Sequence, residues 1–291
     1  MKQHLIRHRD WITIIVLSLV WGSSYILMKK GMHAFSPVQV ACLRVTLTGI
    51  VLLPFAIIGF RQLTRRQFGF ILLTGLLGNA LPPFCFTIAQ THVDSSVAGI
   101  LNTTTPIFTL LVSIFIFKLK VKRYTYLGIT LGFIGSASLI IFQKGNIFNH
   151  ASIYAWLIIV ATLMYGLSVN IMKANLQHVN PSTITAVIFV FFGSITGSIL
   201  FSTDFISRLT TSPEGWQSFG YVAILAVAGT AFAMLLYMRL LQRTTPIFAA
   251  TPTYLMPIVA LGWGLTAGES IGLIHFGGMA LILFGVWLVS K

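Results

Sequence analysis

Charged residues are scarce in this chain of 291 residues, and the acidic ones are far fewer than the basic ones. Only 8% of its residues are charged, with 19 Lys or Arg against five Asp or Glu, whereas soluble domains carry about 25% charged residues. So few charged side chains cannot cover the surface of a globular protein of this length. The composition excludes an ordinary soluble enzyme and a disordered chain, and it favours a polytopic membrane protein whose surface faces hydrocarbon.

The side chains that bind metals or carry out redox chemistry are also few or scattered. Cys42 and Cys85 both lie inside apolar stretches, and two such cysteines provide neither a disulfide framework nor a metal-binding spacing. The seven histidines lie mostly in termini, loops or expected helix ends and form no cluster. We therefore expect no metal site and no cofactor.

Catalytic groups are missing at membrane depth as well. No apolar stretch has a carboxylate or a histidine at its centre, and an intramembrane enzyme would need such groups there, so we do not expect an enzyme. The net charge of +14 would indicate a nucleic acid partner in a soluble protein. Here the basic residues occupy short gaps between apolar runs, so membrane topology explains them and we expect no nucleic acid partner.

Apolar runs dominate what is present, because 56% of the residues are hydrophobic. Ten runs are nearly all long enough for the ~20 residues that a membrane-spanning helix needs, and only the second contains a charge, Arg44. They cover residues 11–28, 31–60, 67–93, 95–117, 124–143, 145–172, 174–203, 215–238, 244–268 and 270–290. These runs do not show the strict alternation of apolar and polar residues that is typical of strands in a membrane β-barrel. The sequence therefore predicts an all-α integral membrane protein with ten transmembrane helices.

The first run resembles a signal peptide in having basic residues before it. It is longer than the usual apolar core of such a peptide and has no clear cleavage site, so we expect a retained helix. Of the Lys and Arg residues, fourteen lie in the termini and the even-numbered gaps, and only Lys29, Lys30, Lys144 and Arg208 lie in the odd-numbered gaps. Short cytoplasmic loops carry the excess of positive charge. We predict a multi-pass protein of the inner (plasma) membrane with both termini in the cytoplasm.

The two halves of the chain repeat one pattern at offsets of 144 to 151 residues. The repeated positions are Trp21-Gly22-Ser23-Ser24 with Tyr165-Gly166-Leu167-Ser168, Pro37 with Pro181, Gly78 with Gly229, Ala98 with Ala249 and Pro106 with Pro257. We predict a first five-helix repeat in residues 1–146 and a second in 147–291, together forming one membrane domain. Because five is odd, the repeats have inverted topology. Inverted repeats typify secondary transporters with a substrate site near the membrane midplane, although channels also contain them.

Polar and aromatic residues gather at mid-membrane depth in several runs. Trp21 pairs with Tyr165 across the repeat, and Asn79 pairs with Thr230. Polar groups that face lipid are costly, so these groups face one another or a wet cavity. Interhelical hydrogen bonding explains any single Ser or Thr, whereas the paired set favours a substrate cavity. The candidate substrate-binding residues are Trp21, Ser24, Asn79, Asn102, Thr103, Tyr165, Thr230, Tyr254 and Arg44.

Arg44 lies seven residues past Pro37, which is about 10 Å into the membrane at 1.5 Å per residue. Two interpretations stay open for it. In the first, its side chain extends to the outer interface or pairs with Asp94 or Glu269. In the second, it binds a carboxylate of the substrate.

Prolines interrupt the helical hydrogen bonding at similar depth. Pro106 and Pro257 remove the bonds to the carbonyls of Asn102 and Thr253, respectively. Their match across the repeat makes them candidate hinges for alternating access, and a packing role is the alternative.

Several motifs resemble the EamA-type family of the drug/metabolite transporter superfamily. They are Trp21-Gly22-Ser23-Ser24, Pro37 followed by Leu43-Arg44, Ala98 followed by Thr105-Pro106-Ile107-Phe108, and Gly268-Glu269. The resemblance covers almost the whole chain and is specific for family rather than for substrate. Members often carry a Gly-Glu after the fourth helix too. Here that place reads Phe117-Lys118-Leu119, so a role for Glu269 does not extend to the first repeat.

The resulting hypothesis is a secondary transporter of small organic solutes that works by alternating access. The resemblance implies export of amino acids, other metabolites or foreign compounds, and uptake also occurs in the superfamily. A channel or facilitative pore is the rival function. The expected partners are a small-molecule substrate and the lipid bilayer, and a homodimer stays open. All five acidic residues lie in termini, loops or helix ends, so we predict facilitated diffusion or exchange without a buried-carboxylate proton step.

Overall fold

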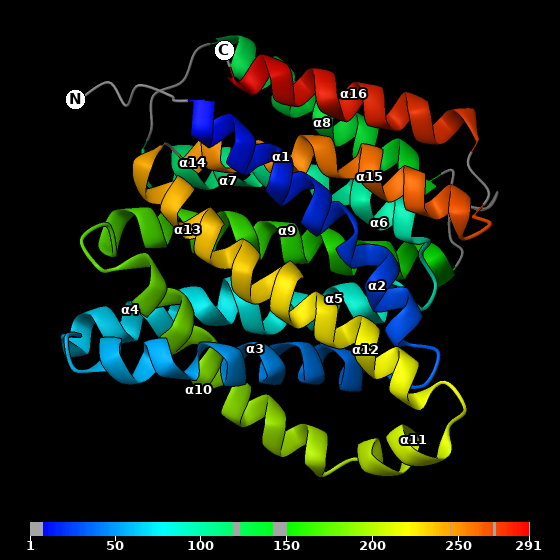
Figure 1. Cartoon of the computed structure of the whole chain (residues 1–291). Coiled ribbons are helices and arrows are strands. Elements are labelled where there is room, and N and C mark those ends of the chain that lie inside the picture. The colour runs from blue at the N-terminus through cyan, green and yellow to red at the C-terminus, as the bar shows by residue number, and fades with distance from the viewer. Residues whose placement is uncertain (1–7, 119–122, 142–149, 245, 270–271, 291) are drawn as a thin grey trace.

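The computed structural model describes residues 8–118, 123–141, 150–244, 246–269 and 272–290. Throughout these residues the ordered elements are helices, and no strand occurs among them. The long helices lie side by side in one bundle, with α8 and α16 together along one edge and α10 and the short α11 at the opposite edge (Figure 1).

The helices follow the predicted runs, and several consecutive helices together form one span. The first half contains α1 (His8–Gly22), α2 (Ser24–Gly31), α3 (Pro37–Phe60), α4 (Arg65–Gly75), η1 (Leu76–Ala80), α5 (Leu81–Ala89), α6 (Ser95–Leu101), η2 (Asn102–Thr104), α7 (Thr105–Phe115) and α8 (Arg123–Ile141). The second half contains α9 (His150–Asn175), α10 (Pro181–Phe201), α11 (Phe205–Thr211), α12 (Gly215–Ala226), η4 (Val227–Phe232), α13 (Ala233–Arg243), α14 (Pro246–Ala249), α15 (Pro252–Thr266) and α16 (Leu273–Ser290).

Within the described residues, seven helical segments are long and apolar enough to cross a membrane. They are His8–Gly31, Pro37–Phe60, Arg65–Ala89, Ser95–Phe115, Ile153–Asn175, Pro181–Phe201 and Gly215–Arg243. Shorter apolar helices, Leu255–Thr266 and Leu273–Gly285, occupy the last two predicted runs, and α8 occupies the fifth. The total of ten spans stays a prediction. The predicted repeat boundary at 146/147 falls in 142–149, outside the described residues.

Local sequence signals fix where the helices of the first half begin. Ser36 precedes α3, and its hydroxyl accepts from the backbone N–H of Gln39 at 3.2 Å while the Gln39 side chain accepts from the Ser36 N–H at 2.9 Å. This capping box satisfies donors that would otherwise be unpaired at a helix start, and Pro37 at the first turn has no N–H to satisfy. Thr64 and Gln67 form the same motif before α4.

Small residues bring helices from the two halves into close contact. A Cβ built at Gly49 of α3 would collide with the carbonyl oxygen of Phe189 in α10. Gly193 of α10 lies on the same seam, and the hydroxyls of Thr46 and Thr196 are 3.0 Å apart across it. Glycine allows such backbone approach in membranes. The small-residue pattern of α10 therefore packs within one chain.

Two helices widen at matching places. The segment η1 of the first half and η4 of the second are both π-helical, and their residues Asn79 and Thr230 differ by 151 in number, the offset of the sequence repeat. π-Helical turns commonly occur at functional sites because they shift side-chain register and loosen backbone hydrogen bonding. Both segments face the cavity described below.

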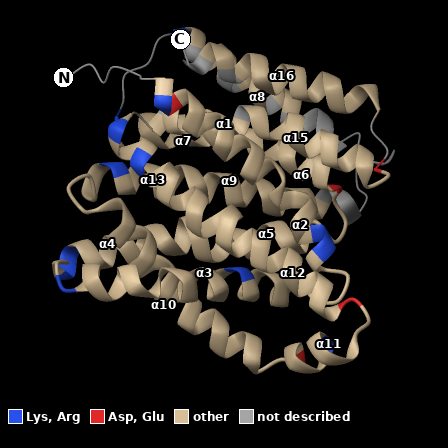
Figure 2. Cartoon of the chain, in the orientation of Figure 1, with Lys and Arg blue, Asp and Glu red and all other residues tan. Residues whose placement is uncertain are grey.

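Charge divides between the two ends of the bundle (Figure 2). Basic residues gather where α4 begins and α13 ends, and we call this end the Arg243 face. Acidic residues gather near α11 and the end of α15, where Lys29 also lies, and we call this end the Glu269 face. The asymmetry agrees in direction with the charge count of the sequence, which predicts a cytoplasmic Arg243 face.

Candidate functional site

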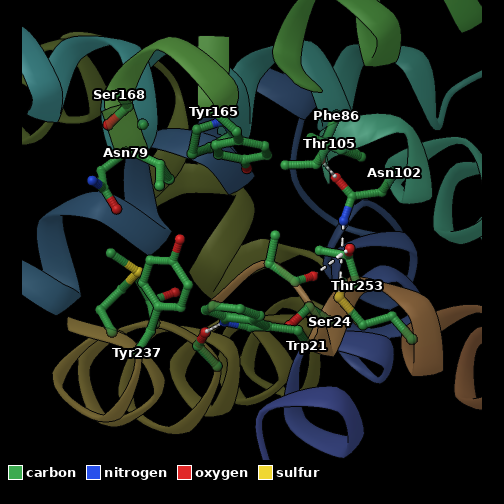
Figure 3. A pocket seen from close by; sticks show the side chains of 18 of the residues that line it. Trp21, Ser24, Asn79, Phe86, Asn102, Thr105, Tyr165, Ser168, Tyr237 and Thr253 are labelled. Atoms are coloured by element: carbon green, nitrogen blue, oxygen red, sulfur yellow. Dashed lines mark hydrogen bonds between the residues drawn. The ribbon is translucent and has the colours of Figure 1, made fainter. Parts of the chain in front are cut away.

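One cavity of about 130 Å³ lies between the two halves of the bundle. A single water molecule needs roughly 10–15 Å³ by this kind of measure, so the cavity has room for several waters or a small organic solute. Its walls come from α1, α2, α3, η1, α5, η2 and α7 of the first half and from α9, α10, η4, α13, α14 and α15 of the second. Figure 3 shows side chains of both halves pointing into this shared space.

Aromatic rings form two opposing walls of the cavity (Figure 3). Trp21 and Tyr237 pack together with ring centroids 5.3 Å apart, and Tyr165 stacks on Phe86 at 6.2 Å. Tyr25 also packs against Phe86, with ring centroids 5.9 Å apart. Such walls bind apolar and aromatic groups through their faces and supply hydroxyls at their rims.

The π-helical segments place polar groups beside these rings. The indole N–H of Trp21 donates to the carbonyl of Gly229 at 3.0 Å, and the Thr230 hydroxyl donates to the carbonyl of Leu225 at 3.0 Å. A widened helix leaves such carbonyls available to side chains. Asn79 in η1 lines the cavity and makes no side-chain hydrogen bond to the described residues, so its amide can bind a solute through both donor and acceptor atoms.

The fourth predicted span changes its winding where it meets the cavity. Asn102–Thr104 form a 3₁₀ turn, and the Thr105 N–H donates to the Asn102 carbonyl. Pro106 cannot donate to this carbonyl, and the tighter i→i+3 bond from Thr105 takes the place of the lost i→i+4 bond. The Asn102 side chain accepts from the Thr105 hydroxyl at 3.2 Å and contacts the Met256 sulfur at 3.9 Å.

Arg44 of α3 is the only basic side chain among the residues that line the cavity in the described part of the chain. Its Nε donates to the Thr230 hydroxyl at 2.8 Å, and its Nη1 lies 3.8 Å from the Met28 sulfur. No described carboxylate pairs with it. The structure thus does not support pairing of Arg44 with Asp94 or Glu269.

Those two carboxylates instead hold the Glu269 face together. Lys29, at the end of α2, lies 2.8 Å from a Glu269 oxygen and 3.8 Å from Asp94. Glu269 also accepts hydrogen bonds from the backbone N–H groups of Ser95 and Ser96 at the start of α6, and each N–O distance is 3.0 Å. We call these contacts of Lys29, Glu269, Ser95 and Ser96 the clamp. It joins α2, α6 and the segment after α15.

Charge and hydrogen bonding determine the ionisation of the clamp. Burial raises the pKa of Glu269, whose side chain is 2% exposed, but hydrogen bonds from Lys29, Ser96 and Ser95 outweigh that and leave its pKa below the ordinary value. The carboxylate is therefore charged at neutral pH. Since Met28 lines the cavity and directly precedes Lys29, the clamp lies next to the Glu269-face end of the cavity.

Most of the predicted site residues lie on the cavity wall. The structure places there Trp21, Ser24, Asn79, Asn102, Tyr165, Thr230 and Arg44. Thr103 does not line it, because its buried hydroxyl donates to the carbonyl of Ile100 at 2.6 Å. Tyr254 lies in α15, and its side chain is outside the described part of the structure.

The candidate hinges lie just behind the cavity wall rather than in it. Pro106 occupies the first turn of α7, and Pro257 lies inside α15. Both remain candidate hinges.

Sequence reasoning missed several residues of the wall, although helical spacing could have found some of them. Tyr25 follows Trp21 by four residues, Ser168 follows Tyr165 by three, and Phe86 follows Asn79 by seven. Residues at these spacings share one helix face. The same spacings relate Tyr237 to Thr230, Met28 to Trp21 and Met172 to Tyr165, each seven residues apart. These residues were missed because an apolar helix face that lines a cavity has the same composition as one that faces lipid.

The chemistry of the wall is that of a binding site for a solute. It combines aromatic rings, amides and hydroxyls with one guanidinium, and none of its described residues is Asp, Glu or His. Among the described residues, no group of three His, Cys, Asp or Glu side chains could hold a metal ion.

Comparison with known proteins identifies the kind of molecule. The model of the EamA-like transporter family matches residues 11–141 and again residues 152–291. The chain belongs to the EamA-like transporter family. The predicted family is thus confirmed, and one match falls in each predicted half. As an EamA-like transporter, the chain is a multi-pass membrane protein with the bilayer and a small-molecule substrate as its partners.

Named relatives cover nearly the whole chain. An uncharacterized inner membrane transporter, YedA of Escherichia coli (strain K12), is 29% identical over 95% of this chain and 89% of its own length. An uncharacterized transporter of Archaeoglobus fulgidus is 21% identical over 97% of this chain and 99% of its own. A solved crystal structure superposes with a TM-score of 0.66 at 14% identity, covering 98% of this chain and 97% of the other. That likeness supports the fold alone.

Proposed function

We propose that this EamA-like transporter is a carrier that moves small organic solutes through the central cavity by alternating access. The observation that carries the proposal is the cavity itself, which is walled by side chains from both halves and has the clamp beside one end. In secondary transporters built from two repeats, the substrate binds between the repeats while one half rocks against the other. The proposal includes export across the inner membrane, with the Arg243 face and both termini in the cytoplasm.

Two features support an inverted repeat of residues 1–146 and 147–291 as the moving parts. The π-helical segments η1 and η4 occupy equivalent places in the two halves. Trp21 and its repeat mate Tyr165 lie on opposing walls of the cavity (Figure 3). Solute contacts therefore come from both halves, so rocking at Pro106 and Pro257 would change access to the solute from either face.

The rival function is a channel or facilitative pore. The clamp favours a carrier, because three segments are tied together at the Glu269 face by an ion pair and two backbone hydrogen bonds. A pore that conducts continuously needs no such closure. The wall also lacks Asp and Glu among its described residues, so we propose exchange or facilitated diffusion rather than proton coupling through a buried carboxylate.

Transport assays test this function. Metabolites inside and outside cells with and without the protein would be profiled to find the solute, and the candidates would be tested in proteoliposomes. A carrier gives counterflow, in which trapped unlabelled solute drives transient accumulation of labelled solute, and Asn79→Ala should reduce it while the protein still folds. Flux of the solute without any counterflow would support the pore instead.

A further inference from the structure

Arg44 presents unused hydrogen-bond donors to the cavity. A guanidinium carries five N–H groups and no acceptor. One of them donates to the Thr230 hydroxyl and another points to the weakly accepting sulfur of Met28. The other N–H groups have no protein acceptor among the described residues, although Arg44 lines the cavity from α3.

The negative charges that could have neutralised Arg44 are all engaged elsewhere. The chain has five acidic residues, and the structure describes every one of them. Their ion pairs are Asp10 with Arg9, Asp94 and Glu269 with Lys29, Asp204 with Arg208, and Glu214 with His33. Arg44 is thus a permanent positive charge without a protein counter-charge in the described structure.

Such a charge is expensive to keep inside a membrane and is usually functional. Folding does not require it at the equivalent place of the other half, because position 188, which is 144 residues after Arg44, is a fully buried isoleucine. The charge therefore makes the two sides of the cavity different. A guanidinium matches a carboxylate by two parallel hydrogen bonds, and it keeps its charge at every accessible pH.

From this geometry we propose that Arg44 binds the carboxylate of an organic solute whose apolar body packs on the aromatic walls. The proposal deepens the carrier function by naming the solute class, and it rests on that function only in treating the bound molecule as cargo. Trp21, Tyr165 and Phe86 supply the faces for the body. Asn79 provides an amide for a second polar group.

Matched probes test the charge requirement directly. Purified protein would be titrated with 3-phenylpropionate, 3-phenylpropionamide and 3-phenylpropylamine, and with the butyrate, butyramide and butylamine series, by isothermal calorimetry. The members of a series share a similar body and differ in charge. Since hydrogen bonds to charged groups are the stronger ones, we expect the carboxylate to bind about ten- to a hundredfold more tightly than the amide, and the amine to bind least.

Variants test whether Arg44 causes the preference for the carboxylate over the amide. Arg44→Gln should abolish the difference between carboxylate and amide, whereas Arg44→Lys should retain part of it because the charge remains and the two-pronged geometry does not. Arg66→Gln, the same change at an exposed arginine on α4 that lies over the Phe70 ring, should leave the difference intact. Melting temperature and gel-filtration profile would verify folding of each variant.

The outcomes separate this inference from the carrier proposal. If the carboxylate binds no more tightly than the amide to the wild type, whether both bind or neither binds, the inference about Arg44 is overturned even if Arg44→Gln does not fold. Equal carboxylate preference in folded Arg44→Gln also overturns it. Arg44-dependent binding without counterflow in proteoliposomes would leave the site standing and contradict the carrier.

Discussion

The clamp at the Glu269 face offers the sharpest test of how the cavity closes. Glu269→Gln removes the negative charge that Lys29 and the N–H groups of Ser95 and Ser96 bind. Hydrogen bonds to charged groups contribute ~1.5–3 kcal/mol each. Glutamine can still accept from one backbone amide and Lys29 is 34% exposed, so solvent weakens its share. We therefore expect the closed state to lose about 2 kcal/mol.

That loss changes how often the cavity opens at the Glu269 face. At about 1.4 kcal/mol per factor of ten, it raises the open population about thirtyfold. A reporter cysteine at Ser24, in a background without Cys42 and Cys85, would be labelled by a membrane-impermeant maleimide from the Glu269 face. The labelling rate should rise by up to about thirtyfold in Glu269→Gln and much less in Glu269→Asp. An unchanged rate in a folded Glu269→Gln protein would refute the role of the clamp in closure.

Further predictions concern pH, packing, the cavity and energy coupling. Because the pKa of Glu269 is lowered on folding, its stabilisation is present above the ordinary carboxylate pKa and is lost as pH falls through the folded value. The difference in melting temperature between wild type and Glu269→Gln should therefore shrink at acid pH, and a constant difference would contradict it. Gly49→Ala should lower the free energy of unfolding by about 1–3 kcal/mol, because the added methyl group forces α3 away from α10. The control Gly69→Ala, at a position with no neighbour within 4 Å, should be neutral or stabilising. Chemical denaturation measures both. Trp21→Ala should reduce transport severalfold in a folded protein, and normal transport would place the solute elsewhere. Counterflow should persist without a proton gradient, and an absolute requirement for one would contradict the exchange mechanism.

Sequence patterns predicted the helices and much of the cavity wall because apolar runs, helical spacing and repeat pairing each carry physical information. Trp21, Tyr165, Asn79 and Thr230 were predicted to face one another or a wet cavity because polar groups are costly in lipid, and the structure places all four on the cavity wall. The π-helical winding of η1 and η4 was not predicted, because a one-residue widening leaves no mark on hydropathy.

Other features depend on contacts between segments distant in sequence. The clamp joins Lys29 to Glu269, 240 positions apart, whereas the charge count placed Lys29 only in a gap between two apolar runs. The same pairing decides what Arg44 can bind, since it removes both candidate carboxylates. The short helix α11 (Phe205–Thr211) lies in a stretch that was expected to be only a loop.

The most direct test of the account is transport through a protein whose Glu269 face can be locked. Lys29→Cys and Glu269→Cys would be combined in the background without Cys42 and Cys85, then joined by a bifunctional methanethiosulfonate that reducing agents release. We expect counterflow to stop on cross-linking and to return on reduction, while each single-cysteine protein is unaffected by the reagent. Counterflow that continues at the same rate in the cross-linked protein would contradict passage of the solute through a cavity that opens at this face.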